Sequence, residues 1–176
     1  MKIVFGLGNF GDKYAYTYHN MGFLTAECLA DRLSLKFKKR ECDGLIAEGN
    51  LCGEKLLIVK PLTYMNLSGL CVKQVVNKHK ADMRDVIAVF DDIDIPRLSV
   101  RVRMNGSGGT HNGMRNIVDV MKSEDFPRVR LGIGRPPEHV PLGDYVLSEV
   151  PKSDRHDFAD MIERAADEVL KLIRGG

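Results

Sequence analysis

Residues 2–11 read KIVFGLGNFG, a short apolar run that ends in closely spaced glycines. Such a run predicts a buried strand that passes directly into a loop. The glycines allow the backbone to turn sharply there, and they leave Asn9 in a position where side chains are commonly presented to solvent or to a ligand. We therefore expect a strand near the start of the chain, with a polar group at its end.

The rest of the chain alternates between strand-like and helix-like segments. Apolar or alternating patterns predict strands at residues 44–49, 55–59, 86–90, 98–104 and 129–134. Helices are predicted at residues 20–33, 68–79, 112–122 and 154–174, and residues 50–53 are predicted to form a hairpin turn. Strands that alternate with helices are typical of an α/β fold. No repeat or linker divides the chain, so we predict a single-domain sandwich over residues 1–176, with a twisted mixed β-sheet flanked by helices.

The chain has 176 residues and is 44% hydrophobic, which is enough to bury one substantial core. Its formal net charge of +2 does not by itself indicate a nucleic-acid binder. The charges are unevenly distributed, however. Residues 97–135 hold eight Lys or Arg and three acidic residues, whereas residues 149–168 hold seven acidic and three basic residues. This distribution favours an anionic partner near the basic region, and solvated surfaces are the alternative.

The four cysteines form no CxxC pair and have no ligand-like spacing with histidine; they are Cys28, Cys42, Cys52 and Cys71. This pattern is typical of reduced thiols in a cytosolic protein. The sequence also shows no charged and apolar leader and no apolar run of about twenty residues. We therefore expect a cytoplasmic protein that has no membrane partner.

Gly6, Gly8 and Gly11 also spell GxGxxG, the fingerprint of dinucleotide-binding folds. That motif requires a helix that starts at the third glycine and an acidic residue about twenty positions later, at the end of the next strand. Here residues 12–19 are loop-like, and Asp31 falls inside a predicted helix. An NAD-dependent oxidoreductase is therefore the weaker interpretation, and we expect no cofactor.

Five polar residues follow apolar runs or lie in turn-prone stretches; they are Asn9, His19, Asn66, Asp91 and Asn112. A histidine supplies a base near neutral pH, an aspartate can orient it, and asparagines can hold a polar substrate without adding charge. His19 precedes a predicted helix, whose N-terminus would keep the ring neutral, as a general base requires. The set suits hydrolysis by an activated water molecule.

These residues also have structural interpretations. A lone histidine is usually structural or exposed, and Asn66 or Asn112 could each be the N-cap of a helix. Asp91, Asp92 and Asp94 could bind Mg²⁺. Neighbouring strand positions point in opposite directions, however, and no second carboxylate motif accompanies them, so we expect no metal.

Two pairs of arginines lie at alternate positions of predicted strands. Arg101 and Arg103 share one strand face, and Arg128 and Arg130 share a face of a later strand. Pairs at this spacing are compatible with a solvated sheet face and also with phosphate contacts.

Several segments together resemble the bacterial-type peptidyl-tRNA hydrolases. The stretch GLGNFGDKYAYTYHNMG, residues 6–22, is similar to the opening motif of that family, usually G-L-G-N-P-G-x-x-Y-x-x-T-R-H-N-x-G. KPLTYMNLSG resembles the second motif, and VFDDIDIPRLSVRVRMNGSGGTHNGMRNI resembles the third. FPRVRLGIGRP and GDYVLSEVP are similar to later segments, so the resemblance runs almost end to end and stays in register.

The resemblance implies a metal-free esterase that cleaves the ester between a peptide and the 3′ ribose of tRNA, and so recycles tRNA during translation. It implies that His19 is the general base and that Asp91 orients and polarises it. The implied substrate-binding residues are Asn9, Asn66, Asn112, Tyr14, Tyr64 and Met65. Arg103 and Arg130 match basic positions that the family associates with the 5′ phosphate of tRNA.

Four positions depart from the family pattern. Phe10 replaces the usual proline, Tyr18 replaces the arginine before the histidine, and Phe90 stands where His or Tyr is frequent. Thr110 stands where the family has glycine, and a β-branched residue is costly at positive φ, so we expect the loop to differ there.

From these observations we predict a monomeric hydrolase that acts on peptidyl-tRNA. Asn9 or a backbone N–H is expected to stabilise the negative charge that develops on the ester carbonyl. The alternative is a non-catalytic RNA-binding relative, in which the basic faces persist and His19 is incidental.

Overall fold

Four apolar runs form the parallel centre of one seven-stranded sheet in the computed structural model, which describes residues 1–175. They are β1 (Lys2–Gly6), β4 (Glu54–Pro61), β5 (Val86–Asp92) and β7 (Arg128–Gly132). β1 lies between β4 and β5, and β5 pairs with β7. These strands are mostly buried, as expected for parallel strands that helices cover on both faces.

Three antiparallel strands extend the sheet at its two sides. β3 (Gly44–Leu51) and β2 (Phe37–Glu41) continue it beyond β4, and β6 (Val100–Arg103) pairs with β7, which gives the order β2-β3-β4-β1-β5-β7-β6. The predicted hairpin joins β3 to β4. Its turn residues Cys52 and Gly53 both have positive φ, which matches the twist of a two-residue hairpin loop.

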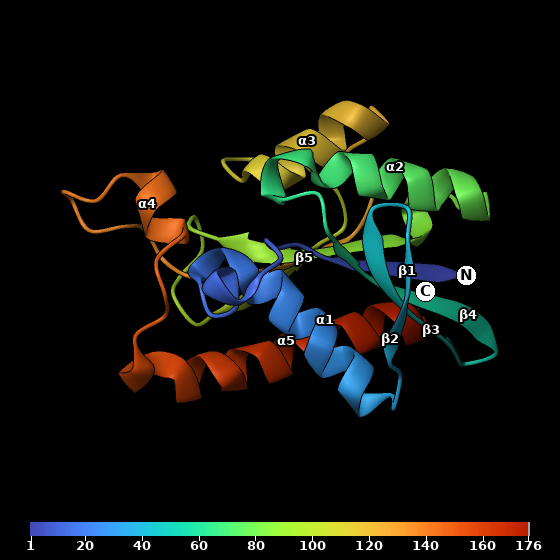
Figure 1. Ribbon diagram of the computed structural model, residues 1–176, viewed down its shortest axis with the longest axis horizontal. Helices are drawn as coiled ribbons and strands as arrows, with labels where there is room; N and C mark the ends of the chain where they lie inside the picture. The colour runs from blue at the N-terminus through green and yellow to red at the C-terminus, as the bar shows by residue number, and fades with distance from the viewer. Residues whose placement is uncertain (176) are drawn as a thin grey trace.

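Helices cover both faces of the sheet (Figure 1). Helices α1 (Met21–Arg32) and α5 (Arg155–Gly175) pack on one face, and α2 (Ser68–His79) and α3 (Asn112–Met121) pack on the other. Two separate apolar cores result, one on each side of the sheet. The predicted α/β fold with a mixed sheet flanked by helices is therefore confirmed.

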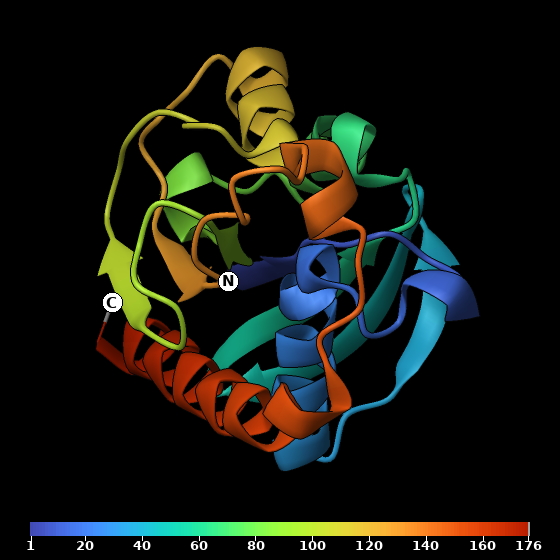
Figure 2. The same ribbon diagram turned by 90° about the vertical axis from the view of Figure 1, so that its left-hand side faces the viewer.

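Short elements gather beyond the end of the sheet where the parallel strands finish. Helix α4 (Leu142–Val146) stands there, as Figures 1 and 2 show. The 3₁₀ turns η1 (Asp12–Tyr14) and η2 (Tyr18–Asn20) follow β1, and η3 (Met65–Leu67) follows β4. Two further 3₁₀ turns are η4 (Met83–Asp85), which precedes β5 at the other end of the sheet, and η5 (Lys152–Asp154), which precedes α5. Ligands of open α/β sheets bind outside the carboxyl ends of the strands, so this end is where a site is expected.

Two glycines bring the start of α1 against the sheet. A Cβ atom on Gly22 would lie 2.3 Å from the Val89 carbonyl oxygen, and one on Gly6 would lie 2.2 Å from the Gly22 carbonyl oxygen. No larger side chain fits this crossing without movement of the backbone. The glycines that suggested a dinucleotide site therefore serve in part to pack α1. In addition, α1 begins ten residues after Gly11, and it contains Asp31 within its length.

Within residues 1–175, no helix is long and apolar enough to cross a membrane.

Candidate active site

The parallel strands deliver three of the predicted residues to one end of the sheet. Asn9 follows β1, Met65 follows β4, and Asp91 is the second-to-last residue of β5. His19 enters from η2, just before α1, and His111 directly precedes α3.

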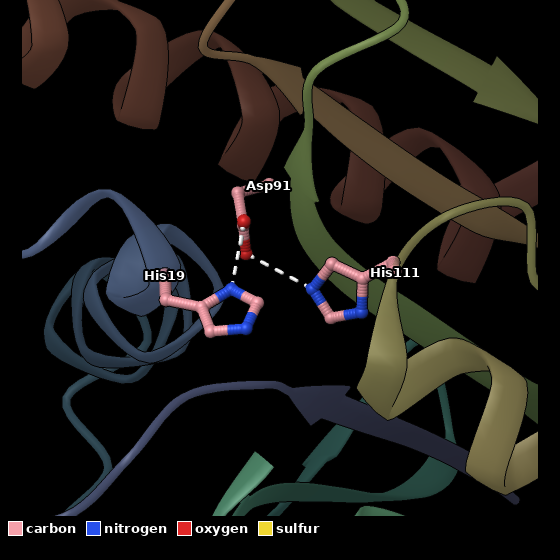
Figure 3. A group of neighbouring side chains, drawn as sticks. All are labelled: His19, Asp91 and His111. Atoms are coloured by element: carbon pink, nitrogen blue, oxygen red, sulfur yellow. Dashed lines mark hydrogen bonds and ion pairs between the residues drawn. The ribbon is translucent and has the colours of Figure 1, made fainter. Parts of the chain in front are cut away.

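Asp91 is the centre of a buried group of three ionisable side chains (Figure 3). His19 Nδ1 lies 2.9 Å from Asp91 Oδ2, and His111 Nε2 lies 3.1 Å from Asp91 Oδ1. His19 is 7% exposed, Asp91 is 2% exposed and His111 is 8% exposed. One carboxylate is thus held between two imidazole rings, and water reaches very little of it.

The backbone determines which nitrogen of His111 carries a proton. The Met114 N–H donates to His111 Nδ1 at 3.1 Å, so that nitrogen must be an unprotonated acceptor. The proton of neutral His111 is then on Nε2, where it is donated to Asp91. Since Asp91 also accepts from His19 Nδ1–H, Nε2 of neutral His19 is left unprotonated, which is the state a general base needs.

The pKa shifts follow from burial and from these contacts. Burial alone would raise the pKa of Asp91. The charges and hydrogen bonds of His19 and His111 lower that pKa by more, so the net shift is downward and Asp91 stays ionised. Burial lowers the pKa of His19, but the charge and hydrogen bond of Asp91 more than offset this and raise it above 6.5. The expectation that a helix N-terminus keeps His19 neutral is therefore wrong in sign, because the Asp91 carboxylate is the stronger influence. His111 is different, since burial dominates and lowers its pKa.

Asn9 is fixed by hydrogen bonds to Asn20, which follows His19, and to Met65. Its backbone N–H donates to Asn20 Oδ1 at 2.8 Å, and Asn20 Nδ2 donates to the Asn9 carbonyl at 2.8 Å. The Met65 N–H donates to Asn9 Oδ1 at 2.7 Å, which fixes the orientation of the Asn9 amide. The Asn9 Nδ2 group donates to no residue of the described chain (residues 1–175) and remains available to a ligand.

A cavity of about 390 Å³ opens beside the three ionisable residues. Its walls include the predicted residues His19, Asp91, Asn112, Arg103 and Arg130, together with His111 and residues of α4. The structure therefore brings the catalytic candidates and the basic candidates into one cavity.

The other predicted residues form a second group beside this cavity. The Phe10 and Tyr64 rings stack with centroids 4.4 Å apart, and Tyr14 meets Tyr64 edge-on at 6.5 Å. Asn66 is exposed on η3, and Met65 is buried beneath it. The two groups meet where the Met65 sulfur packs against Gly113, whose added Cβ would lie 2.5 Å from it.

The four arginines of β6 and β7 have different roles. Arg101 lies opposite Arg130, and Arg103 lies opposite Arg128. Arg128 is only 2% exposed and donates to three backbone carbonyls, those of Ser107, Glu124 and Phe126. The interpretation of Arg128 as part of a solvated or phosphate-binding face is therefore wrong, because it braces the loops from inside.

Arg130 and Arg103 remain open to a ligand. Arg130 Nη1 lies 3.7 Å from Asp92, and its Nε is buried without a hydrogen-bond partner. Arg103 is exposed, and its side chain lies against Gly106 at the mouth of the cavity. Both side chains line the cavity, so an anion bound there would lie close to two guanidinium groups.

Sequence reasoning missed two residues and misplaced one cap. His111 is the N-cap of α3, a role that was the structural alternative for Asn112, and Asn20 of η2 hydrogen-bonds to the Asn9 backbone. A histidine one residue before a helix was a usable signal for His111, whereas nothing local marked Asn20.

Thr110 avoids positive φ because Gly109 adopts it, with a φ of 59°, and the Thr110 hydroxyl contacts Asp94 at 3.2 Å.

The three central side chains could be considered as a metal site, since one possible ligand atom from each lies within 4.8 Å of the others. Hydrogen bonds already account for these atoms in both histidines and in the carboxylate. The arrangement therefore needs no cation to explain it.

Comparisons with known proteins point to one family. The family described as "Peptidyl-tRNA hydrolase" matches residues 3–176. Proteins named "Peptidyl-tRNA hydrolase" from Chloroflexus aurantiacus and Alkaliphilus oremlandii are each 42% identical to this chain; the alignments cover 100% of it and 94% and 95% of the relatives. A crystal structure of peptidyl-tRNA hydrolase from Acinetobacter baumannii superposes with a TM-score of 0.92 at 31% identity, covering 99% of this chain and 89% of that one.

Proposed function

Because this chain belongs to the peptidyl-tRNA hydrolase family and is a hydrolase of ester bonds, we propose that it cleaves peptidyl-tRNA with a water molecule activated by His19. One observation supports this most directly. His19 Nδ1 is held by the buried Asp91 carboxylate, while Nε2 has no hydrogen-bond partner in residues 1–175, and the ring lines the cavity.

The proposed reaction follows from these proton positions. Water gives a proton to His19 Nε2, and its oxygen attacks the ester carbonyl, which gives a tetrahedral intermediate. Asp91 stabilises the imidazolium that forms, because its charge favours the protonated ring. When the carbon–oxygen bond to the ribose breaks, the imidazolium returns its proton to the leaving 3′ oxygen. The products are a peptide carboxylate and a tRNA with a free 3′ hydroxyl.

Asn9 is the proposed donor to the developing oxyanion. Its Oδ1 is occupied by the Met65 N–H, so the Nδ2 group must point elsewhere. A donor fixed before the substrate arrives stabilises new charge without reorganisation, which is why such groups contribute strongly to rate. Asn66, Asn112, Tyr14, Tyr64 and Met65 are proposed to bind the peptide and the terminal adenosine.

Arg103 and Arg130 are proposed to bind a phosphate of the tRNA. The supporting observation is that both guanidinium-bearing side chains line the cavity and that Arg103 is exposed, because arginine binds phosphate oxygens well. We further propose that residues 1–176 form one catalytic domain that acts as a monomer in the cytoplasm.

The test is release of deacylated tRNA from peptidyl-tRNA in the presence of EDTA. Wild type should turn over, and His19→Ala should lower kcat by roughly 10²–10⁴ with little loss of tRNA binding. His156→Ala is the matched control, because that side chain is 88% exposed on α5. Equal activity of His19→Ala and wild type would remove the general-base role. Binding without turnover in wild type would favour the RNA-binding alternative.

A further inference from the structure

Arg97 lies between β5 and β6 and is not part of the cavity wall. Its guanidinium group nevertheless joins four segments that are distant in the sequence. Nη2 donates to the Tyr18 hydroxyl at 3.1 Å and to Asp154 Oδ2 at 2.9 Å. Nη1 donates to the Ile133 carbonyl at 3.2 Å and to the Tyr145 hydroxyl at 3.4 Å.

The same group lies over two neighbouring aromatic rings. Its central carbon lies 5.3 Å from the centroid of Tyr18 and 4.9 Å from that of Phe158. A planar guanidinium can stack and donate at the same time, which an ammonium group cannot do. The side chain is 36% exposed, so solvent reaches one side of this junction and the other side is packed.

Two of the joined segments are η2, the turn that carries Tyr18 and His19 and is called the catalytic turn below, and α4. The Tyr18 and Tyr145 rings stack with centroids 4.7 Å apart and planes at 27°. The backbone continues the connection, because the Tyr18 N–H donates to the Ser148 carbonyl at 3.1 Å and the Val150 N–H donates to the Tyr16 carbonyl at 2.9 Å. Residues 16–18 and 148–150 are therefore joined by two backbone hydrogen bonds as well as by the stacked rings.

The two attached elements, η2 and α4, both border the cavity. Tyr18 is the residue before His19, and α4 contributes Leu142, Gly143 and Val146 to the wall. The position of α4 relative to η2 therefore affects the shape of the cavity beside the His19 ring.

We infer that Arg97 is a positioning residue for peptidyl-tRNA hydrolysis, which clamps α4 to the catalytic turn through Tyr18 and Tyr145. The inference rests on the proposed role of His19. The His19–Asp91 pair is held separately, by β5 and by the hydrogen bonds of Asn20 to the Asn9 backbone. Loosening the clamp therefore alters how the substrate is held and leaves proton transfer almost unchanged.

The test uses Arg97→Met, which keeps an unbranched apolar stem and removes the hydrogen bonds. KM for peptidyl-tRNA should rise about tenfold, below the roughly 100-fold effect of a full 1 Å misplacement, and kcat should change less than about threefold. The acid limb of the pH–rate profile should stay where it is. Hydrogen exchange at the amides of Tyr145, Ser148 and Val150 should become faster, whether or not substrate is present.

Two further variants keep the test sharp. Tyr18→Phe removes only the hydroxyl that accepts from Arg97, keeps the stack, and should change KM in the same direction by a smaller factor. If Arg97→Met folds poorly, the KM of Tyr18→Phe tests the inference in its place. Arg97→Lys should not restore KM, because an ammonium cannot reach the same set of acceptors in one plane.

Arg32→Met is the matched control. Arg32 of α1 donates to Glu163 at 3.0 Å and to Asp167 at 2.6 Å, and within residues 1–175 no hydrogen bond joins it to residues 16–18 or 145–150. An equal rise of KM in this variant, or wild-type KM and exchange in Arg97→Met, would overturn the inference. Activity retained by His19→Ala would instead overturn the proposed function, and the exchange measurement is independent of that outcome.

Discussion

The acid limb of the pH–rate profile reports the His19–Asp91 pair. His19 acts as a base only when neutral, and its pKa is raised above 6.5, so kcat/KM should fall as the pH drops through that raised value. Asp91→Asn removes the charge that raises the pKa and leaves burial, which lowers it. The acid limb should then move to lower pH, with a lower plateau because the ring loses its orienting acceptor. The measurement is kcat/KM across about pH 5 to 8.

Asp92→Asn is the control for this profile, because Asp92 is next to Asp91 and pairs with Arg130 instead of with a histidine. Its acid limb should match that of wild type. An unchanged limb in Asp91→Asn would separate Asp91 from the titration of His19.

His111 has two hydrogen bonds, and two substitutions can separate them. His111→Ala removes the cap of α3 and the donor to Asp91, so the free energy of unfolding should fall by about 1–2 kcal/mol and kcat by about tenfold. His111→Asn supplies a new cap acceptor but is too short to replace the ring at Asp91. It should recover most of the stability and little of kcat, as denaturant unfolding and steady-state kinetics would show. Joint recovery of both quantities would contradict the division of roles.

The functional side chains were easier to predict from the sequence than the contacts that they make. Asn9 and Asp91 could be chosen because each follows an apolar run, and a polar group there has few reasons to be packed. His111 could not be joined to Asp91 from sequence, since that contact depends on the approach of α3 to the end of β5. The buried state of Arg128 was hidden for the same reason, because the carbonyls it satisfies come from two loops.

The crossing of α1 over the sheet is the contact between elements that is most sensitive to the size of a side chain. Gly22→Ala should destabilise the protein by about 1–3 kcal/mol, because the new methyl would meet backbone atoms of β5 and of Leu7 at 2.3–2.5 Å. Activity should also fall, since η2 and His19 lead directly into α1. Gly143→Ala in α4 is the control for thermal unfolding, because nothing lies within 4 Å of its added Cβ and the change should be neutral or slightly stabilising. Similar melting temperatures for the two variants would show that the crossing tolerates more than its contacts allow.

Helices and strands with a clear hydrophobic pattern could be predicted from the sequence, whereas short polar elements could not. Helix α2 has the predicted bounds, Ser68–His79, and β5 begins at the predicted Val86. Strand β2 reads FKKRE, with one apolar residue in five, because it is an edge strand of which only Phe37 packs against a core. Helix α4 has five residues and includes a glycine, so tertiary contacts rather than propensity keep it in place.

For the whole molecule, the uneven charge distribution predicts a salt-dependent affinity. If Arg103 and Arg130 each contact a phosphate, replacing both with Ala should weaken tRNA binding and reduce the slope of log Kd against log salt by roughly two. Arg84→Ala is the control, because η4 lies at the opposite end of β5 and Arg84 pairs with Asp82. Binding measured at several salt concentrations decides the question. A slope equal to that of wild type would rule out both phosphate contacts.

The order of the strands leaves β2 and β6 as the two edges of the sheet. β2 carries Lys38, Lys39 and Arg40, and β6 carries Arg101 and Arg103. An edge strand offers unpaired N–H and C=O groups to any other strand, and charged side chains are a common defence against such pairing. Since both edges are positive, two copies that approach edge to edge repel each other. The charges proposed to attract an RNA backbone on one side of the molecule therefore also keep its sheet from growing into that of a neighbour.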